Sequence, residues 1–175
     1  FYMLVGNLFT QFSSDPSQVS RTVHFLNALL SAGCILFLFW SITRLVRSLL
    51  KEEKENLSVT DVIIILGSGL VGALAYTFSD TFWFSAVEGE VYAFSSFLTA
   101  LVFWMILRWQ DESDTVYGDR WIILIAYIIG LSIGVHLLNL LCIPAIVLVF
   151  YYQKYRTISL KGAIAAIALS GLLIV

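Results

Sequence analysis

Two glutamates and a histidine are the residues of this sequence whose types and spacing best suit chemistry. Glu88 and Glu90 flank Gly89, directly before an apolar run, and His136 lies between two other apolar runs. A carboxylate can accept a proton or a hydrogen bond from a hydroxyl, and an imidazole can donate to a phosphate oxygen. We therefore consider a substrate-binding site made of Glu88, Glu90, His136, Asp80, Asn139 and Trp83.

Glu88, Glu90 and His136 also have a purely structural interpretation. Carboxylates at the start of a helix are stabilised by the helix dipole, which alone would account for Glu88 and Glu90. A histidine between apolar helices is more often a buried group with a hydrogen-bond partner than a catalytic one. The preceding segment Phe82-Trp83-Phe84 favours the functional interpretation, because so apolar a loop would not lie freely in water.

Other chemical signatures are weak. A Glu-x-Glu pair with a distant histidine could hold a divalent cation, but this spacing is not diagnostic, and we expect no cofactor. Cys34 and Cys142 both lie in apolar runs, which predicts packed thiols rather than a disulfide. The segment 67–72 matches the glycine pattern of dinucleotide-binding proteins, yet that motif requires a soluble strand–turn–helix unit. Within a membrane span, small residues more often let helices approach closely, and Gly130 and Gly134 are expected to do the same.

The composition is that of a membrane protein. The chain has 175 residues, of which 59% are hydrophobic and 13% charged, and its mean hydropathy is +0.90. A soluble domain carries about 25% charged residues. The apolar residues also fall in long runs, which is typical of helices that face hydrocarbon. We expect an all-α polytopic membrane protein and no nucleic-acid partner.

The apolar runs define the elements that we expect in a single transmembrane domain. Residues 1–12 place apolar side chains at helical spacing but are too few to span, which predicts an interfacial amphipathic helix. Asp15 and Pro16 then mark the start of the next helix, and Ser58 with Asp61 marks another. Residues 79–89 are expected to be an acidic, aromatic loop. The expected spans are about 25–46, 62–78, 91–107, 121–135, 137–152 and 161–175.

Residues 121–152 are ambiguous between one helix and two. A single helix of that length would measure about 48 Å, well beyond a hydrocarbon core of about 30 Å. Two spans divided near 134–136 place nine of the ten Lys and Arg residues on one side, with only Arg21 on the other. One long helix would weaken this split to six against four. Cytoplasmic loops collect Lys and Arg, so we favour two spans, with His136 and residues 79–90 on the opposite, non-cytoplasmic side.

The acidic segment also resembles a known family. Residues 81–93, TFWFSAVEGEVYA, resemble a bacterial membrane family, long of unknown function, that is related to protein O-mannosyltransferases. Residues 130–138, GLSIGVHLL, look like a second family segment, and residues 1–50 are similar to the stretch after the family's first outer loop. The resemblance covers most of the chain, and the first segment is its most specific part.

The resemblance implies a GT-C-type helical bundle with an active site in loops that face the periplasm or the lumen. Such enzymes transfer a sugar from a polyprenyl-phosphate carrier to an acceptor, often a protein hydroxyl, and here a glycan acceptor also stays open. The resemblance implies that the catalytic base, an Asp of the first outer loop, lies before Phe1. Glu88 and Glu90 match the family's paired acids and His136 its histidine, which implies roles in positioning the substrate or the carrier phosphate.

Taken together, the sequence predicts part of a glycosyltransferase of the bacterial inner membrane. Its expected partners are a lipid-linked sugar donor, membrane lipid and the acceptor. A transporter or flippase also needs many helices, but its spans would more often carry ionisable groups at mid-membrane. A non-catalytic membrane subunit is a third alternative.

Overall fold

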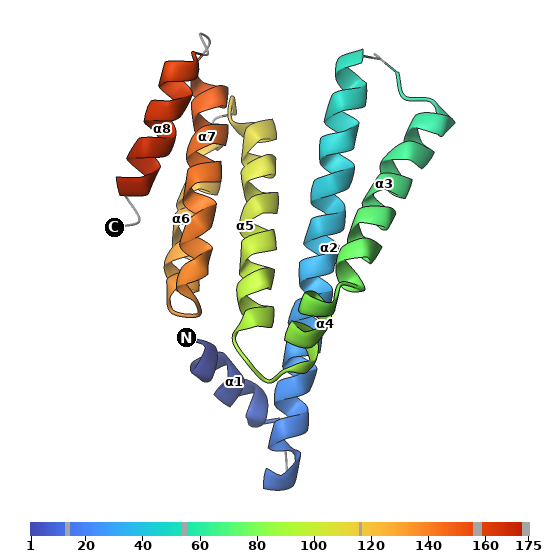
Figure 1. Cartoon of the computed structure of the whole chain (residues 1–175), viewed down its shortest axis with the longest axis vertical. Coiled ribbons are helices and arrows are strands. Elements are labelled where there is room, and N and C mark those ends of the chain that lie inside the picture. The colour runs from blue at the N-terminus through green and yellow to red at the C-terminus, as the bar shows by residue number, and fades with distance from the viewer. Residues whose placement is uncertain (13–14, 54–55, 116, 156–158, 173–175) are drawn as a thin grey trace.

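The computed structural model describes residues 1–12, 15–53, 56–115, 117–155 and 159–172, which form helices and no strands. Figure 1 shows two arms that meet at one end and diverge at the other. One arm holds α2 and α3, and the other holds α5 to α8. The elements are α1 (Tyr2–Thr10), η1 (Pro16–Gln18), α2 (Val19–Glu53), α3 (Val59–Thr77), α4 (Asp80–Val87), α5 (Tyr92–Glu112), α6 (Asp119–Ile133), η2 (Leu137–Leu141), α7 (Cys142–Lys154) and α8 (Leu160–Leu172).

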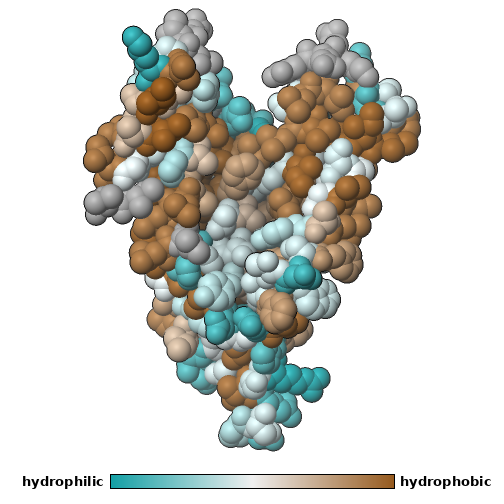
Figure 2. All heavy atoms as spheres, in the orientation of Figure 1, coloured by the Kyte–Doolittle hydropathy of each residue, from teal (hydrophilic) through white to brown (hydrophobic). Residues whose placement is uncertain are grey.

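Three of the described helices are long and apolar enough to cross a membrane. These are α2 with η1, α3 and α5. Their outer surfaces expose large apolar side chains, such as Ile63 and Val71 on α3, which suit contact with lipid. Figure 2 shows such apolar surface over both arms. The chain is thus an all-α polytopic membrane protein, as its composition predicts.

The helices α6, α7 and α8 have 15, 13 and 13 residues, fewer than the roughly 20 that a straight span requires. The chain is not one helix between residues 119 and 154, because α6 ends at Ile133 and α7 begins at Cys142. Gly134 and the 3-10 turn η2 separate them. That these shorter helices each cross the membrane stays a prediction.

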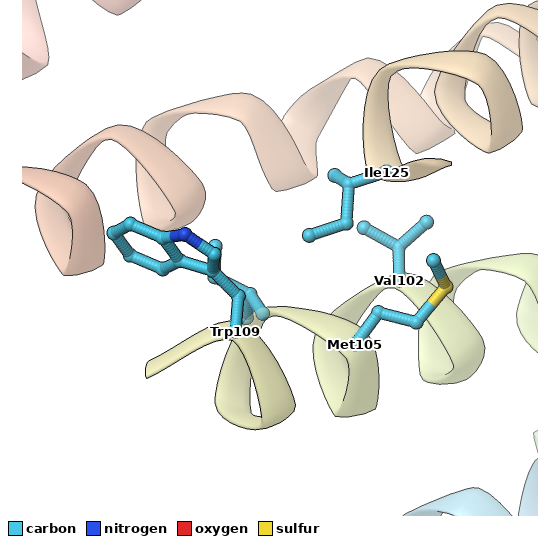
Figure 3. Packing of buried hydrophobic residues seen from close by; sticks show 5 residues of the cluster. Val102, Met105, Trp109 and Ile125 are labelled. Carbon is cyan, nitrogen blue, oxygen red and sulfur yellow. The ribbon is translucent and has the colours of Figure 1, made fainter. Parts of the chain in front are cut away.

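An apolar core joins α5 to α6 and α7. It consists of buried Val102, Met105, Ile106, Trp109 and Ile125. Figure 3 shows Ile125 of α6 directed toward Val102 of α5. The ring of Trp109 also stacks on Phe150 of α7, with ring centroids 5.4 Å apart. This packing fixes α5 as the helix on which the second arm is built.

One predicted loop is wrong. Residues 80–87, expected in a loop, form the helix α4, because no Gly or Pro interrupts them and Asp80 lies in the first turn, where the dipole favours a carboxylate. Phe82 anchors this helix by packing its ring 4.5 Å from that of Tyr76. The expected span 25–46 lies within α2, which continues on both sides from Val19 to Glu53, since Lys, Leu, Arg and Glu in its last turns are good helix formers.

The expected helix starts are confirmed. Asp15 caps η1 by accepting a hydrogen bond from the backbone N of Ser17, with Pro16 in the first turn. Ser58 and Asp61 form a reciprocal capping box at the start of α3. Both motifs satisfy backbone N–H groups that a helix start otherwise leaves without partners.

Glycines in α2 and α3 permit close helix packing. A Cβ on Gly69 would lie 2.4 Å from Cγ2 of Thr43, and one on Gly72 would lie 2.6 Å from Cδ1 of Ile42. A Cβ on Gly67 or on Gly130, by contrast, would meet no atom of the described residues within 4 Å, whereas one on Gly134 would lie 3.3 Å from Cβ of Phe1. The expectation of close helix packing is therefore confirmed for Gly69 and Gly72 and is wrong for Gly67 and Gly130.

We predict that Gly69→Ala destabilises the protein by about 1–3 kcal/mol, because the added methyl group overpacks the α2–α3 contact. Gly67→Ala on the same helix is the matched control, and it should be neutral or stabilising by up to about 1 kcal/mol through helix propensity. Thermal unfolding of the detergent-purified protein, followed by circular dichroism, measures both. Equal melting temperatures for the two variants would contradict the proposed packing.

Candidate functional site

The two glutamates lie in a turn that a buried asparagine holds in place. Nδ2 of Asn27, on α2, donates to the carbonyl oxygens of Glu88 and Glu90, the latter at 3.0 Å. Asn27 is fully buried, and its Oδ1 accepts a hydrogen bond from the hydroxyl of Tyr2 at 3.4 Å. One amide thus ties α1, α2 and the turn between α4 and α5 together. We call residues 88–91 the acidic turn.

The acidic turn begins where α4 ends. Glu88 is the C-cap of α4 in an extended conformation, and its backbone N donates to the carbonyl of Phe84 at 3.0 Å. Val91 then caps α5 and accepts from the backbone N of Ser95. Because Asn27 binds backbone carbonyls, the carboxylates of Glu88 and Glu90 are not used to hold the turn. Both side chains are exposed to solvent.

His24 is a neighbour of the acidic turn that the sequence interpretation did not select. A Cβ on Gly89 would make ordinary contacts with His24 and Val23, each at 3.6 Å. An alanine therefore fits at Gly89. The exposed ring of His24 lies beside the turn and brings a second imidazole to this end of the bundle.

His136 lies at the same end of the bundle as the glutamates. It follows α6, and its backbone N donates to the carbonyl of Ser132 at 2.9 Å. Its ring lies 5.5 Å from that of Tyr92, the first residue of α5. Since Tyr92 is only two residues from Glu90, the fold brings residues far apart in sequence to one surface.

Burial affects Tyr2, which contacts the same asparagine. Burial raises the pKa of the Tyr2 hydroxyl, and the nearby charge of Glu90 raises it further, whereas the hydrogen bond with Asn27 lowers it. The net shift is upward, so Tyr2 stays protonated at neutral pH. It can therefore act as the donor that Oδ1 of Asn27 requires.

The other predicted site residues lie elsewhere. Asp80 and Trp83 are on α4 and exposed, and Asp80 is separated from Glu88 by about 12 Å of helix. Asn139 is buried inside the bundle, where its Oδ1 accepts from Ser95 at 2.7 Å and Thr99 at 2.8 Å. Its Nδ2 has no hydrogen-bond partner in the described part of the chain.

Asn139 lines a groove of about 530 Å³ between α2, α3, α5 and α7. The end nearest the acidic turn carries polar side chains, Ser95, Ser96, Thr99 and Asn139. The other end is mostly apolar and is lined by residues such as Ile106 and Val149, together with Ser41, whose hydroxyl donates to the carbonyl of Phe37. Cys34 of α2 and Cys142 of α7 also line this groove, and both are free thiols, as their apolar setting predicts. Along α5 the groove runs about 16 Å, from Ser95 to Ile106.

Metal ligands are not assembled in the described residues. No group of three or more His, Cys, Asp or Glu side chains there is close enough to hold a metal ion. The chemistry that the arrangement offers is hydrogen bonding and proton exchange by two carboxylates and two imidazoles, next to an amphiphilic groove.

These features define a polytopic membrane protein with carboxylate and imidazole groups gathered where its helices end. Residues 1–159 match the family described as Protein O-mannosyl-transferase TMEM260 N-terminal domain. This match covers most of the chain, so the chain belongs to that family, and the resemblance to protein O-mannosyltransferases is confirmed. Neither a search of curated proteins nor a search of solved structures gave a match.

We predict that Asn27→Ala releases the acidic turn. Removing the amide deletes the two part-buried hydrogen bonds that hold the turn, and each such bond contributes about 0.5–1.5 kcal/mol. Amide hydrogen exchange of residues 88–91 should become at least about tenfold faster, since 1.4 kcal/mol corresponds to a factor of ten. The control is Asn7→Ala, an exposed asparagine on α1. Unchanged exchange in the turn would show that Asn27 does not hold it.

Proposed function

We propose that this chain is part of a membrane transferase that moves a sugar from a polyprenyl-phosphate carrier to a protein hydroxyl. Membership of the protein O-mannosyl-transferase family is the observation that carries this proposal. The acidic turn, with His24 and His136 at the same end of the bundle, supports it as the place where the sugar and the carrier phosphate bind.

In the proposed step, the acceptor hydroxyl oxygen bonds to the anomeric carbon of the sugar. The bond from that carbon to the carrier phosphate oxygen breaks, the hydroxyl proton passes to a base, and polyprenyl phosphate leaves with the electron pair. The step as proposed uses no cofactor. We assign the base to a carboxylate outside residues 1–175, as the family resemblance implies.

The exposed carboxylates of Glu88 and Glu90 suit the hydroxyls of a sugar, because an ionised carboxylate accepts two or more hydrogen bonds. The imidazoles of His24 and His136 suit the leaving phosphate, whose developing charge requires donors. Arg21, which is exposed one turn before His24 on α2, adds a positive charge at this end.

The groove between α2, α3, α5 and α7 suits the isoprenoid chain of the carrier. Its polar end lies toward the acidic turn, and its apolar end extends into the part of the bundle that faces hydrocarbon. A carrier in this groove would keep its chain in the membrane and its phosphate near His136. Asn139, which has an unused amide N–H group, lies where the two parts of the carrier would join.

We place this site on the periplasmic face of a bacterial inner membrane. The support is the charge pattern, in which Lys and Arg gather at the opposite ends of the helices. With this orientation the acidic turn and His136 meet substrates outside the cytoplasm.

We predict that Glu88→Gln, Glu90→Gln and His136→Gln each lower kcat/KM of the full-length enzyme for the lipid-linked sugar by about 10- to 100-fold. Hydrogen bonds to charged groups contribute about 1.5–3 kcal/mol, and each 1.4 kcal/mol is a factor of ten. Asp114→Asn, an exposed acid near the other end of the bundle, is the control and should retain full activity. Normal transfer by the triple variant would remove these residues from the site.

A bulky residue in the groove should interfere with long carriers selectively. We predict that Ala100→Trp raises KM for a long-chain polyprenyl donor by about tenfold or more, because the indole fills space that the chain occupies. The same variant should use a water-soluble, short-chain donor as the wild type does. Ala126→Trp, exposed on α6, is the control. Equal effects on both donors would exclude the groove as the chain site.

A further inference from the structure

A second cavity lies away from the acidic turn, between α2, α3 and α5 with Trp121 of α6. Its volume is about 560 Å³. Three arginines and three tryptophans line it: Arg44, Arg47, Arg108, Trp40, Trp104 and Trp121. The proposed transfer reaction does not use this cavity, so the presence of three arginines in the cavity requires another explanation.

Helical spacing brings these side chains to one place. On α2, Trp40, Arg44 and Arg47 recur at intervals of four and three residues, and therefore share one face. On α5, Trp104, Arg108 and Asp111 follow the same spacing. The indoles of Trp40 and Trp104 lie 5.9 Å apart between the two helices. Each helix thus presents an aromatic residue followed by charged ones toward the other.

The charges in the cavity do not cancel. Nε and a second guanidinium nitrogen of Arg44 bind the two carboxylate oxygens of Asp111, the first at 2.7 Å. Arg108 binds Glu112 at 2.8 Å, and Glu112 also accepts from Nε1 of Trp121. Arg47 is exposed and has no ion-pair partner in the described part of the chain. Three guanidinium groups therefore face two carboxylates, which leaves one positive charge.

The cavity also lies near the end of a helix whose length suits a membrane span. Helix α5 has 21 residues, or about 31 Å, which matches the hydrocarbon thickness of a bilayer. A span of this length would place Arg108 and Asp111, in its last turns, at the membrane boundary, where tryptophans also collect. Ile65 and the half-exposed Leu66 of α3 supply an apolar wall on the other side. Figure 2 shows the surface hollowed between the two arms.

We propose that this cavity binds the phosphate headgroup of an anionic membrane phospholipid. The guanidinium of Arg47 binds the phosphate, and Arg108 supplies a second contact, since arginine forks match phosphate oxygens. The tryptophans border the glycerol region, and one acyl chain follows Leu66 along α3. The lipid fills the gap between the α2–α3 arm and the α5–α8 arm, away from the transfer site.

Tryptophan fluorescence tests the proposal, because three of the five tryptophans of residues 1–175 line the cavity and the comparison with Arg47→Gln isolates their contribution. Full-length protein is placed in phosphatidylcholine vesicles, and phosphatidylglycerol brominated near the headgroup end of its chains is added. We expect half-maximal quenching at a concentration about tenfold lower than with brominated phosphatidylcholine. Arg47→Gln should abolish this difference.

Arg120→Gln is the matched control, because Arg120 is also exposed but, at the start of α6, does not line the cavity. It should quench as the wild type does. Arg44 is left unchanged, since its loss would strip Asp111 of its partner. Equal quenching by the two lipids in the wild-type protein, or an unchanged preference in Arg47→Gln, would overturn the proposal. Competition by inorganic phosphate as strong as by the lipid would overturn the assignment to a phospholipid.

Discussion

The candidate site depends on one buried amide. A turn between two helices leaves backbone carbonyls without partners, and inside a bundle each such group is costly. Asn27 supplies both missing donors at Glu88 and Glu90 from the side of α2, and Tyr2 completes its own hydrogen bonding. The carboxylates are consequently positioned by a group that does not neutralise them. A salt bridge could hold the turn as firmly, but it would neutralise the charge on which the proposed substrate binding depends.

The sequence was sufficient for the class of fold and for several local features. Apolar runs predicted an all-α membrane protein, and Ser58 with Asp61 predicted a capped helix start, which the structure confirms. Both depend on local physics, namely burial in lipid and hydrogen bonding within four residues. Helix α4 could also have been predicted, since Ser79 followed by Asp80 and an uninterrupted apolar segment is typical of a helix start.

The contacts between helices were harder to predict. Asn27 is a lone amide within an apolar run, and such a residue signals an interhelical role, but its partners lie about sixty residues away. His24 is recognisable only through its contact at Gly89. Conversely, Asn139 follows His136 by one turn in sequence, yet the 3-10 turn η2 directs it into the bundle toward Ser95. Which face a polar residue presents depends on tertiary packing that no periodicity in this sequence specifies.

The acidic turn, the groove and the arginine-lined cavity all lie along the same two helices, α2 and α5. Helix α2 carries Asn27 at the acidic turn, Cys34 at the groove and Arg44 at the arginine-lined cavity. In the same order, α5 carries Tyr92, Thr99 and Asp111 at these three regions. Because α2 contacts α5 at Cys34 and again at Arg44, the spacing between the regions is set by helix rise rather than by loops. If the proposed ligands bind at these places, this pair of helices would hold a headgroup, an isoprenoid chain and a sugar at fixed distances from one another.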